Sequence, residues 1–202
     1  MVGTFNMYIL QPQWLAKRGI IEQGMGFAIE TNLARPGVRF HLRSYDAIWA
    51  VSPDRLVIET TNSKTDCGEV IARVLEALPE TPLFAIGNNT SFEGELSELD
   101  RLAESFRSCP MLECPPKSGT VEQRTFHVGV KRDEHETINL QLALLQDKIE
   151  LSCNYHRKLD SRDDANSAAM KAASSFFQDR EEATRLAKHF FGSESAYDTD
   201  ND

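Results

Sequence analysis

The chain has 202 residues, 41% of them hydrophobic and 26% charged, which is the composition of an ordinary globular protein. No segment approaches the ~20 apolar residues that a membrane span needs, and the N-terminus lacks the apolar core of a signal peptide. The sequence therefore predicts a cytoplasmic protein that makes no membrane contact.

The formal net charge is −9, and it is unevenly distributed. Residues 1–55 contain six Lys/Arg and four Asp/Glu, whereas the rest of the chain contains sixteen and twenty-seven. Because non-specific binding to nucleic acid depends on neutralising phosphates, so acidic a chain is a poor candidate for it. The balance leaves room for one local basic patch near the N-terminus.

The first half of the chain alternates strands with helices. Apolar Phe5, Met7 and Ile9 alternate with polar residues, which predicts a strand at the N-terminus. Pro12 and Gly19 then mark the start and end of a helix. Apolar alternation and turn residues predict further strands at 27–33, 37–45, 45–51 and 55–61.

A second helix has clear signals at both of its ends. Asp66 can cap it, Glu69 stands three residues further on, and Pro79 stops it. Between them, apolar residues recur at helical spacing along one face. A third apolar stripe, at 95–108, predicts another helix.

A strand and a polar tripeptide follow the second helix. Leu83–Ile86 is mostly apolar and leads directly into Gly87, Asn88 and Asn89. Both residue types tolerate positive φ, so the tripeptide predicts a turn or bulge at the end of the strand. The alternative is a polar loop that presents amide groups to a ligand.

The second half reads as a three-stranded meander and a long helical segment. We expect strands at 121–132, 136–145 and 148–156, and a helical segment at 163–191 that Asp179 and Glu182 could restart as two helices. The fold class is therefore α+β, with mostly antiparallel sheets covered by helices. Two similar halves around one core are an open alternative. The expected domains are an N-terminal half (1–108), a connecting loop (109–120), a C-terminal meander with helices (121–192) and a disordered acidic tail (193–202).

Alternation along the meander places polar side chains on one face of the sheet. His127, Glu150 and His156 stand on that face and could act as acid, base or ligand, although their spacing matches no zinc motif. RNA-binding sheets need exposed aromatic and basic residues, which this face lacks. An ordinary solvated face is the simpler interpretation. The face comprises Gln123, Thr125, His127, Asn139, Gln141, Glu150, Ser152, Asn154 and His156.

A basic strand is the remaining candidate surface. Arg35, Arg39, His41 and Arg43 could contact phosphates or an acidic protein surface. They could equally protect the edge of a sheet from aggregation.

The four cysteines indicate neither a disulfide framework nor a metal site. Cys109 and Cys114 lie five residues apart without a second Cys/His pair, and Cys67 stands at a predicted helix start, where an exposed thiol would have a lowered pKa. A nucleophile also needs a base and an oxyanion donor, which no motif supplies. We therefore expect reduced thiols and no cofactor or metal.

Three motifs together resemble a group of bacterial α+β proteins that have no established activity. These motifs are F-N-x-x-I-x-x-P-x-W-L at residues 5–15, a central strand pair with an arginine in its turn, and T-P-x-x-x-x-G-x-N at residues 81–89. The resemblance covers about residues 2–92 and implies a fold and a bacterial, cytoplasmic setting. It carries over no catalytic residue.

These observations predict a non-catalytic binding or accessory subunit of a bacterial multi-protein system. We expect it to act by macromolecular contact, with a protein partner or by self-association. The candidate binding residues are Arg35, Arg39, His41, Arg43, Gly87, Asn88, Asn89, His127 and His156. The alternatives are a hydrolase or nuclease that uses the His/Glu face, and nucleic-acid binding through the basic strand.

Overall fold

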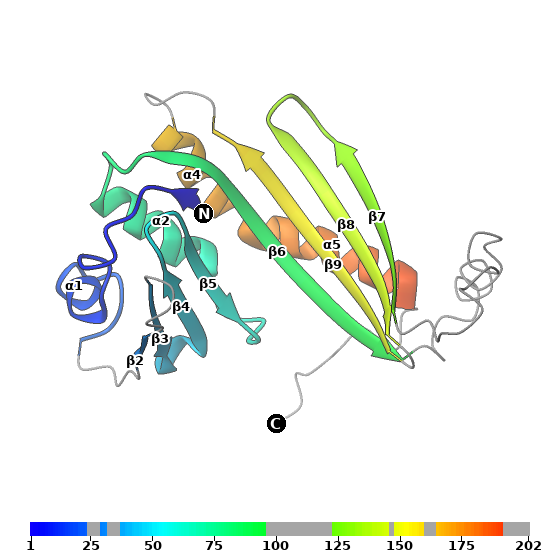
Figure 1. The fold of residues 1–202 in the computed structure, drawn as a ribbon, viewed down its shortest axis with the longest axis horizontal. Helices are drawn as coiled ribbons and strands as arrows, with labels where there is room; N and C mark the ends of the chain where they lie inside the picture. The colour runs from blue at the N-terminus through cyan, green and yellow to red at the C-terminus, as the bar shows by residue number, and fades with distance from the viewer. Residues whose placement is uncertain (24–28, 32–36, 96–122, 146–147, 160–164, 192–202) are drawn as a thin grey trace, which may run out of the picture. The chain divides into compact units, whose positions relative to one another are not determined.

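The fold was analysed in a computed structural model that describes residues 1–23, 29–31, 37–95, 123–145, 148–159 and 165–191 (Figure 1). The described residues form two compact units. Unit 1 comprises those within Met1–Asn88 and His156–Phe177. Unit 2 comprises those within Asn89–Tyr155 and from Gln178 onward. Each unit therefore combines two separate stretches of sequence.

Unit 1 is built around a four-stranded antiparallel sheet of order β2-β3-β4-β5. Its buried face packs into a core in which Trp49 and Phe40 stack with ring centroids 5.8 Å apart. The alternation expected for β3 is confirmed, since Phe40 and Leu42 are buried while Arg39 and His41 are exposed. The strands are β2 (Ile29–Thr31), β3 (Val38–Leu42), β4 (Ala47–Val51) and β5 (Leu56–Thr60).

Two helices near the start of unit 1 match their sequence signals. Helix α1 (Pro12–Lys17) begins at its proline, and Gly19 follows its end with φ of +68°. Helix α2 (Cys67–Ala77) is capped by Asp66, whose side chain accepts a hydrogen bond of 3.0 Å from the backbone N–H of Glu69. The apolar stripe of α2 lies in the same core as the sheet.

The predicted N-terminal strand is largely wrong. Strand β1 covers only Val2–Gly3, and the chain then turns at Asn6. The Asn6 side chain accepts a hydrogen bond from the Tyr8 N–H, and the backbone carbonyl of Asn6 accepts from the N–H groups of Ile9 and Leu10. An asparagine side chain that bonds its own backbone two residues on favours a turn, and here it overrides the apolar alternation.

The long C-terminal helical segment divides at Ser175, not at Asp179 as predicted. Helix α4 (Ala165–Ser174) ends there and α5 (Phe176–Phe191) begins. The hydroxyls of Ser174 and Ser175 donate to carbonyls four residues earlier in the chain. Such back-bonding bends helices, which accounts for a break at the serine pair.

Helix α2 and the end of α4 approach each other very closely within unit 1. A Cβ atom added to Gly68 would lie 2.1 Å from the carbonyl oxygen of Ala173 and 2.6 Å from the Cβ of Phe176. No side chain fits in that space. The glycine in the first turn of α2 is therefore a packing requirement.

Unit 2 pairs strands with α5. Strands β7 (Gln123–Lys131) and β8 (Glu136–Leu145) form the predicted hairpin, and β9 (Lys148–Lys158) and β6 (Leu83–Glu95) lie next in a five-stranded sheet of order β1-β6-β9-β8-β7. Both β6 and β9 contribute residues to each unit. In unit 2, the apolar face of β8 and β9 packs against Ala183, Ala187 and Phe191 of α5.

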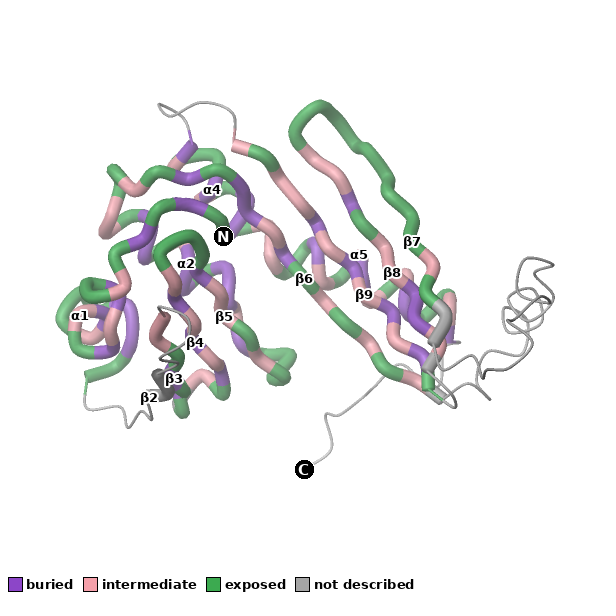
Figure 2. Tube along the Cα trace, in the orientation of Figure 1, coloured by how far each residue is buried: buried purple, intermediate pink, exposed green. Residues whose placement is uncertain are grey.

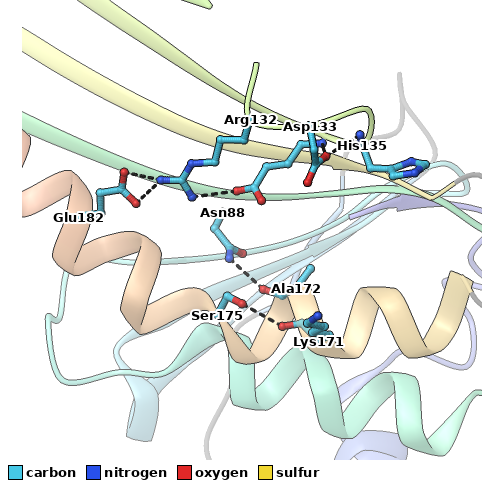
Figure 3. A network of polar contacts seen from close by, with 9 residues as sticks. Asn88, Arg132, Asp133, His135, Lys171, Ala172, Ser175 and Glu182 are labelled. Carbon is cyan, nitrogen blue, oxygen red and sulfur yellow. Dashed lines mark hydrogen bonds and ion pairs between the residues drawn. The ribbon is translucent and has the colours of Figure 1, made fainter. Parts of the chain in front are cut away.

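Arg132, just after β7, ties the hairpin to α5. Its guanidinium donates to both carboxylate oxygens of Glu182 and, at 3.2 Å, to Glu136 (Figure 3). It also lies 5.7 Å from the centre of the buried Tyr155 ring. Hydrogen bonding to Glu182 raises the pKa of Arg132 above its usual value. Asp133 closes the hairpin by accepting from the N–H groups of His135 and Glu136, both at 2.7 Å.

The α+β class with antiparallel sheets is confirmed. The predicted helix at 95–108, the loop at 109–120 and the tail at 193–202 lie outside the described residues, apart from Glu95 at the end of β6. No helix in the described ranges is long and apolar enough to cross a membrane.

The close approach at Gly68 predicts a large loss of stability in the G68A variant. The added methyl group would meet backbone atoms of Ala173, so the helices must separate, at a cost of about 2 kcal/mol in the free energy of unfolding. This outweighs the roughly 1 kcal/mol that alanine gains over glycine in a helix. Denaturant unfolding followed by tryptophan fluorescence measures this loss of stability, since Trp14 and Trp49 both lie in unit 1.

R73A is the matched control on the exposed side of the same helix. It removes the ion pair to Glu69 and should change stability by less than about 0.5 kcal/mol. Equal stability of G68A and the wild type would contradict the packing requirement.

Candidate functional site

The tripeptide Gly87-Asn88-Asn89 lies inside strand β6, so the predicted turn is wrong. Asn88 is 8% exposed, and its Nδ2 donates a 3.1 Å hydrogen bond to the carbonyl of Ala172 in α4 (Figure 3). That carbonyl belongs to the last turn of a helix, where the regular i→i−4 donors run out, and it also accepts a 3.3 Å hydrogen bond from the Ser175 N–H. The asparagine at position 88 is therefore explained by a hydrogen bond to a distant helix and not by a preference for turns.

Asn89, one residue further on, points to the opposite side of the strand and contributes to a polar face in unit 2. Strands β6, β7, β8 and β9 form the floor of a hollow of about 450 Å³. The polar side chains that line this hollow are here called the polar face. Along each strand they alternate with side chains that pack toward α5 or point away from the hollow. The lining consists of Asn89, Ser91, His127, Val128, Gly129, Asn139, Leu140, Gln141, Ser152, Cys153 and Asn154.

Hydrogen bonds link β6 to β9 across this face. Asn154 Nδ2 donates to Asn89 Oδ1 at 2.5 Å. Ser152 Oγ lies 2.9 Å from Ser91 Oγ and 3.0 Å from Glu150 Oε1. A carboxylate only accepts, so Ser152 donates to Glu150 and Ser91 donates to Ser152. The side chains are thus held in place by one another before any ligand arrives.

Two features leave unused space and unused hydrogen-bonding capacity on the polar face. Asn154 Oδ1 is buried and accepts no hydrogen bond within the described ranges. A buried acceptor without a partner is costly, and such groups are uncommon in proteins. Gly129 lies opposite Asn139 in the β7–β8 register, and among the described residues only Asn139 Oδ1, 3.9 Å away, lies near the position of a Cβ. A glycine inside a strand often marks a place that another molecule approaches closely.

The residues of the proposed acid–base set are divided between the two units. His127 is exposed and lines the hollow, and it makes no hydrogen bond to Ser91 or Ser152 within the described part of the chain. Glu150 already accepts from Ser152, and His156 belongs to unit 1. No group of three or more His, Cys, Asp or Glu side chains among the described residues could hold a metal ion.

Only part of the predicted basic strand forms a row of exposed basic side chains. Arg39 and His41 are exposed on β3, but Arg43 begins a 3₁₀ helix (Arg43–Tyr45), and Arg35 lies outside the described residues. Arg39 lies 3.9 Å from Glu59, and both side chains are at least half exposed. Exposed pairs of this kind contribute little to stability, but Glu59 lowers the positive potential that would attract a phosphate.

The described cysteines are buried. Cys67 is 6% exposed and Cys153 1%, so neither presents a thiol to solvent, while Cys109 and Cys114 lie outside the described residues. Burial raises the pKa of Cys153 to about 11, and the nearby carboxylate of Glu182 adds to this shift. A protonated, enclosed thiol is a poor nucleophile.

Comparison with protein-family models, with curated proteins and with solved structures finds no match for this chain. Of the sequence-predicted residues, Asn89 and His127 come together on the polar face, whereas Asn88 supports α4. Ser91 and Gly129 were not singled out from the sequence. Ser91 had only a weak signal, the alternation of Ser91 and Glu93 with Phe92, because the neighbouring Thr90 is also polar.

The raised pKa of Cys153 predicts that unit 2 loses stability at alkaline pH. Between the ordinary thiol value of 9.0 and about 11, the unfolded chain releases this proton while the native protein keeps it, so the free energy of unfolding falls as pH rises. Denaturant unfolding followed by far-UV circular dichroism should show a shallower fall over this range in C153A than in the wild type. Burial also raises the pKa of Tyr155, but this contribution is common to both proteins. Identical pH dependence would show that Cys153 is not enclosed.

Proposed function

We propose that this protein is a non-catalytic binding or accessory subunit of a multi-protein system, and that the polar face of unit 2 contacts its macromolecular partner. The observation that carries the proposal is the hollow on that face, where hydrogen bonds between the strands already hold the carboxamide and hydroxyl side chains in place. A partner segment could bond to the exposed carboxamides of Asn89 and Asn139, each of which offers donors and an acceptor.

The chemistry of the lining favours an uncharged partner segment. The described residues of the lining supply four carboxamides, two hydroxyls and one imidazole, together with apolar side chains and a glycine. A carboxamide offers both donors and an acceptor, which matches the donor and acceptor of a peptide group. Phosphate recognition relies on Arg, Lys or clustered backbone N–H groups, and the described residues of the lining include no Arg or Lys. An extended, uncharged peptide segment is therefore the best-matched ligand.

The form of the site favours a macromolecule over a small molecule. Small-molecule pockets are mostly apolar and aromatic, with a few polar groups that fix orientation. Of the eleven described residues that line the hollow, seven have polar side chains and none is Phe, Tyr or Trp. An open sheet face with this composition resembles the polar part of a protein interface more closely than an enclosed pocket.

Two other functions are weighed against this proposal. A hydrolase or nuclease would use His127, but Glu150 is hydrogen-bonded to Ser152, and His127 bonds neither serine of the face within the described ranges. Nucleic-acid binding would use Arg39, His41 and Arg43, where Glu59 lies beside Arg39. Both alternatives predict results different from those of a binding face.

The G129L variant tests the proposal by filling the hollow from its floor. There is room for the new side chain, so the variant should fold, and it should lose at least ~tenfold in retention of the partner, since a hot-spot contact is worth about 2 kcal/mol. The measurement is quantitative mass spectrometry of proteins retained from host extract on immobilised wild type, G129L and K131L. K131L introduces the same side chain into the same strand outside the lining. Identical retained proteins on wild type and G129L would contradict the proposal.

The H127A variant separates binding from catalysis. If the face is non-catalytic, wild type and H127A should show no difference in turnover of generic ester and phosphodiester substrates, because neither protein hydrolyses them above background. A loss of measurable turnover in H127A with its fold intact would favour the hydrolase instead. Salt-sensitive binding of a fluorescent oligonucleotide, abolished by R39A, would favour the nucleic-acid alternative.

A further inference from the structure

The hydrogen bonds of the polar face decide which of its hydroxyl groups can still donate. An ionised carboxylate only accepts, so the hydroxyl proton of Ser152 points to Glu150, 3.0 Å away. Ser152 Oγ then accepts from Ser91 at 2.9 Å, and this hydrogen bond uses the single hydroxyl proton of Ser91. Ser91 therefore meets a ligand as an acceptor.

Asn89 on the same strand has the opposite polarity. Its Oδ1 accepts from Asn154, so its Nδ2, which carries two protons and bonds no other described residue, is the end of the carboxamide that a ligand meets. Along the unit 2 part of β6, exposed Asn89, Ser91 and Glu93 alternate with half-buried residues, so the three side chains stand on one side of the strand (Figure 2). Strand β6 thus presents a donor and, two residues further on, an acceptor.

We propose that the polar face recognises one amide group of its partner, which accepts from Asn89 Nδ2 and donates to Ser91 Oγ, and that Glu150 sets this order. The inference rests on the proposed function, because it concerns the same face, and it adds the chemical group that is recognised. Glu150 stands outside the described lining and acts through Ser152, so it is a positioning residue.

The spacing and polarity of the two groups select an amide over other polar groups. Two residues of a strand span about 6.7 Å, whereas two hydrogen bonds to a single hydroxyl oxygen span less than about 6 Å. An amide holds its oxygen and nitrogen roughly 2.3 Å apart, so two hydrogen bonds of about 2.9 Å each cover the distance. A carboxylate has no proton for Ser91, and an ammonium or guanidinium group has no acceptor for Asn89.

NMR titration of the ¹⁵N-labelled protein with two uncharged peptides measures this recognition. Acetyl-Gly-Gly-Gly-N-methylamide offers backbone amides alone, and acetyl-Gly-Gln-Gly-N-methylamide adds a carboxamide side chain. We expect a saturable shift of the side-chain amide signal of Asn89. Tighter binding of the glutamine peptide would assign the recognised amide to a side chain, and equal binding would assign it to the backbone. The absence of a saturable shift with either peptide would overturn the inference.

Variants at positions 150 and 152 test how the order is set. A glutamine at position 150 can also donate to Ser152, so E150Q should bind the peptides about fivefold more weakly, the worth of one hydrogen bond. E93Q is the matched control, because it removes the same charge from an exposed residue on the same side of β6. S152A should weaken binding as E150Q does without a change of charge, and S152T, which keeps the hydroxyl, should restore it. Equal binding by E150Q and E93Q, or by S152A and S152T, would contradict the role of Glu150.

Retention of the partner from host extract separates this inference from the proposed function. If E150Q retains as much as the wild type of the protein that G129L loses, the face binds a partner but Glu150 does not order its contacts, and the inference fails alone. If G129L loses nothing, the proposed function itself fails.

Discussion

The close approach of α2 to the end of α4 is the constraint on which unit 1 depends. Gly68 meets the backbone of Ala173 where no Cβ could stand, and Asn88 donates to the neighbouring carbonyl of Ala172. Both contacts fall in the last turn of α4, next to the serines that end it. The C-terminal end of α4 is thus held by Gly68 of α2 and by the buried side-chain amide of Asn88 in β6. This arrangement fixes the position of β6 within unit 1.

Strand β6 then supplies residues to both units through the alternation of its side chains. Asn88 is buried and bonds α4, whereas Asn89 is exposed and bonds Asn154 on the polar face of unit 2. Two adjacent asparagines therefore have different roles, one in packing and one in presenting amide groups. The proposed binding function rests on the second, and the fold of unit 1 rests on the first.

Local signals predicted much of this fold, and tertiary contacts decided the rest. The Asp66 cap, Pro12 and the alternation of β3 could be read directly, because each acts within a few residues. The position of Gly87-Asn88-Asn89 within a strand could not, because the partner of Asn88 lies 84 residues away. The polar face was half predicted: the meander showed its own alternation, but the pairing of β6 with β9 that brings Asn89 to the face has no signature in the sequence.

The most direct test compares N88A with N89A. If the account is correct, N88A loses about 1 kcal/mol of stability in tryptophan-monitored unfolding, because the buried hydrogen bond to the Ala172 carbonyl is lost while that carbonyl keeps its bond from the Ser175 N–H. N89A should unfold like the wild type, yet lose retention of the partner that G129L also loses. The account is contradicted if N89A is the destabilised variant, or if N88A unfolds normally while binding alone is lost.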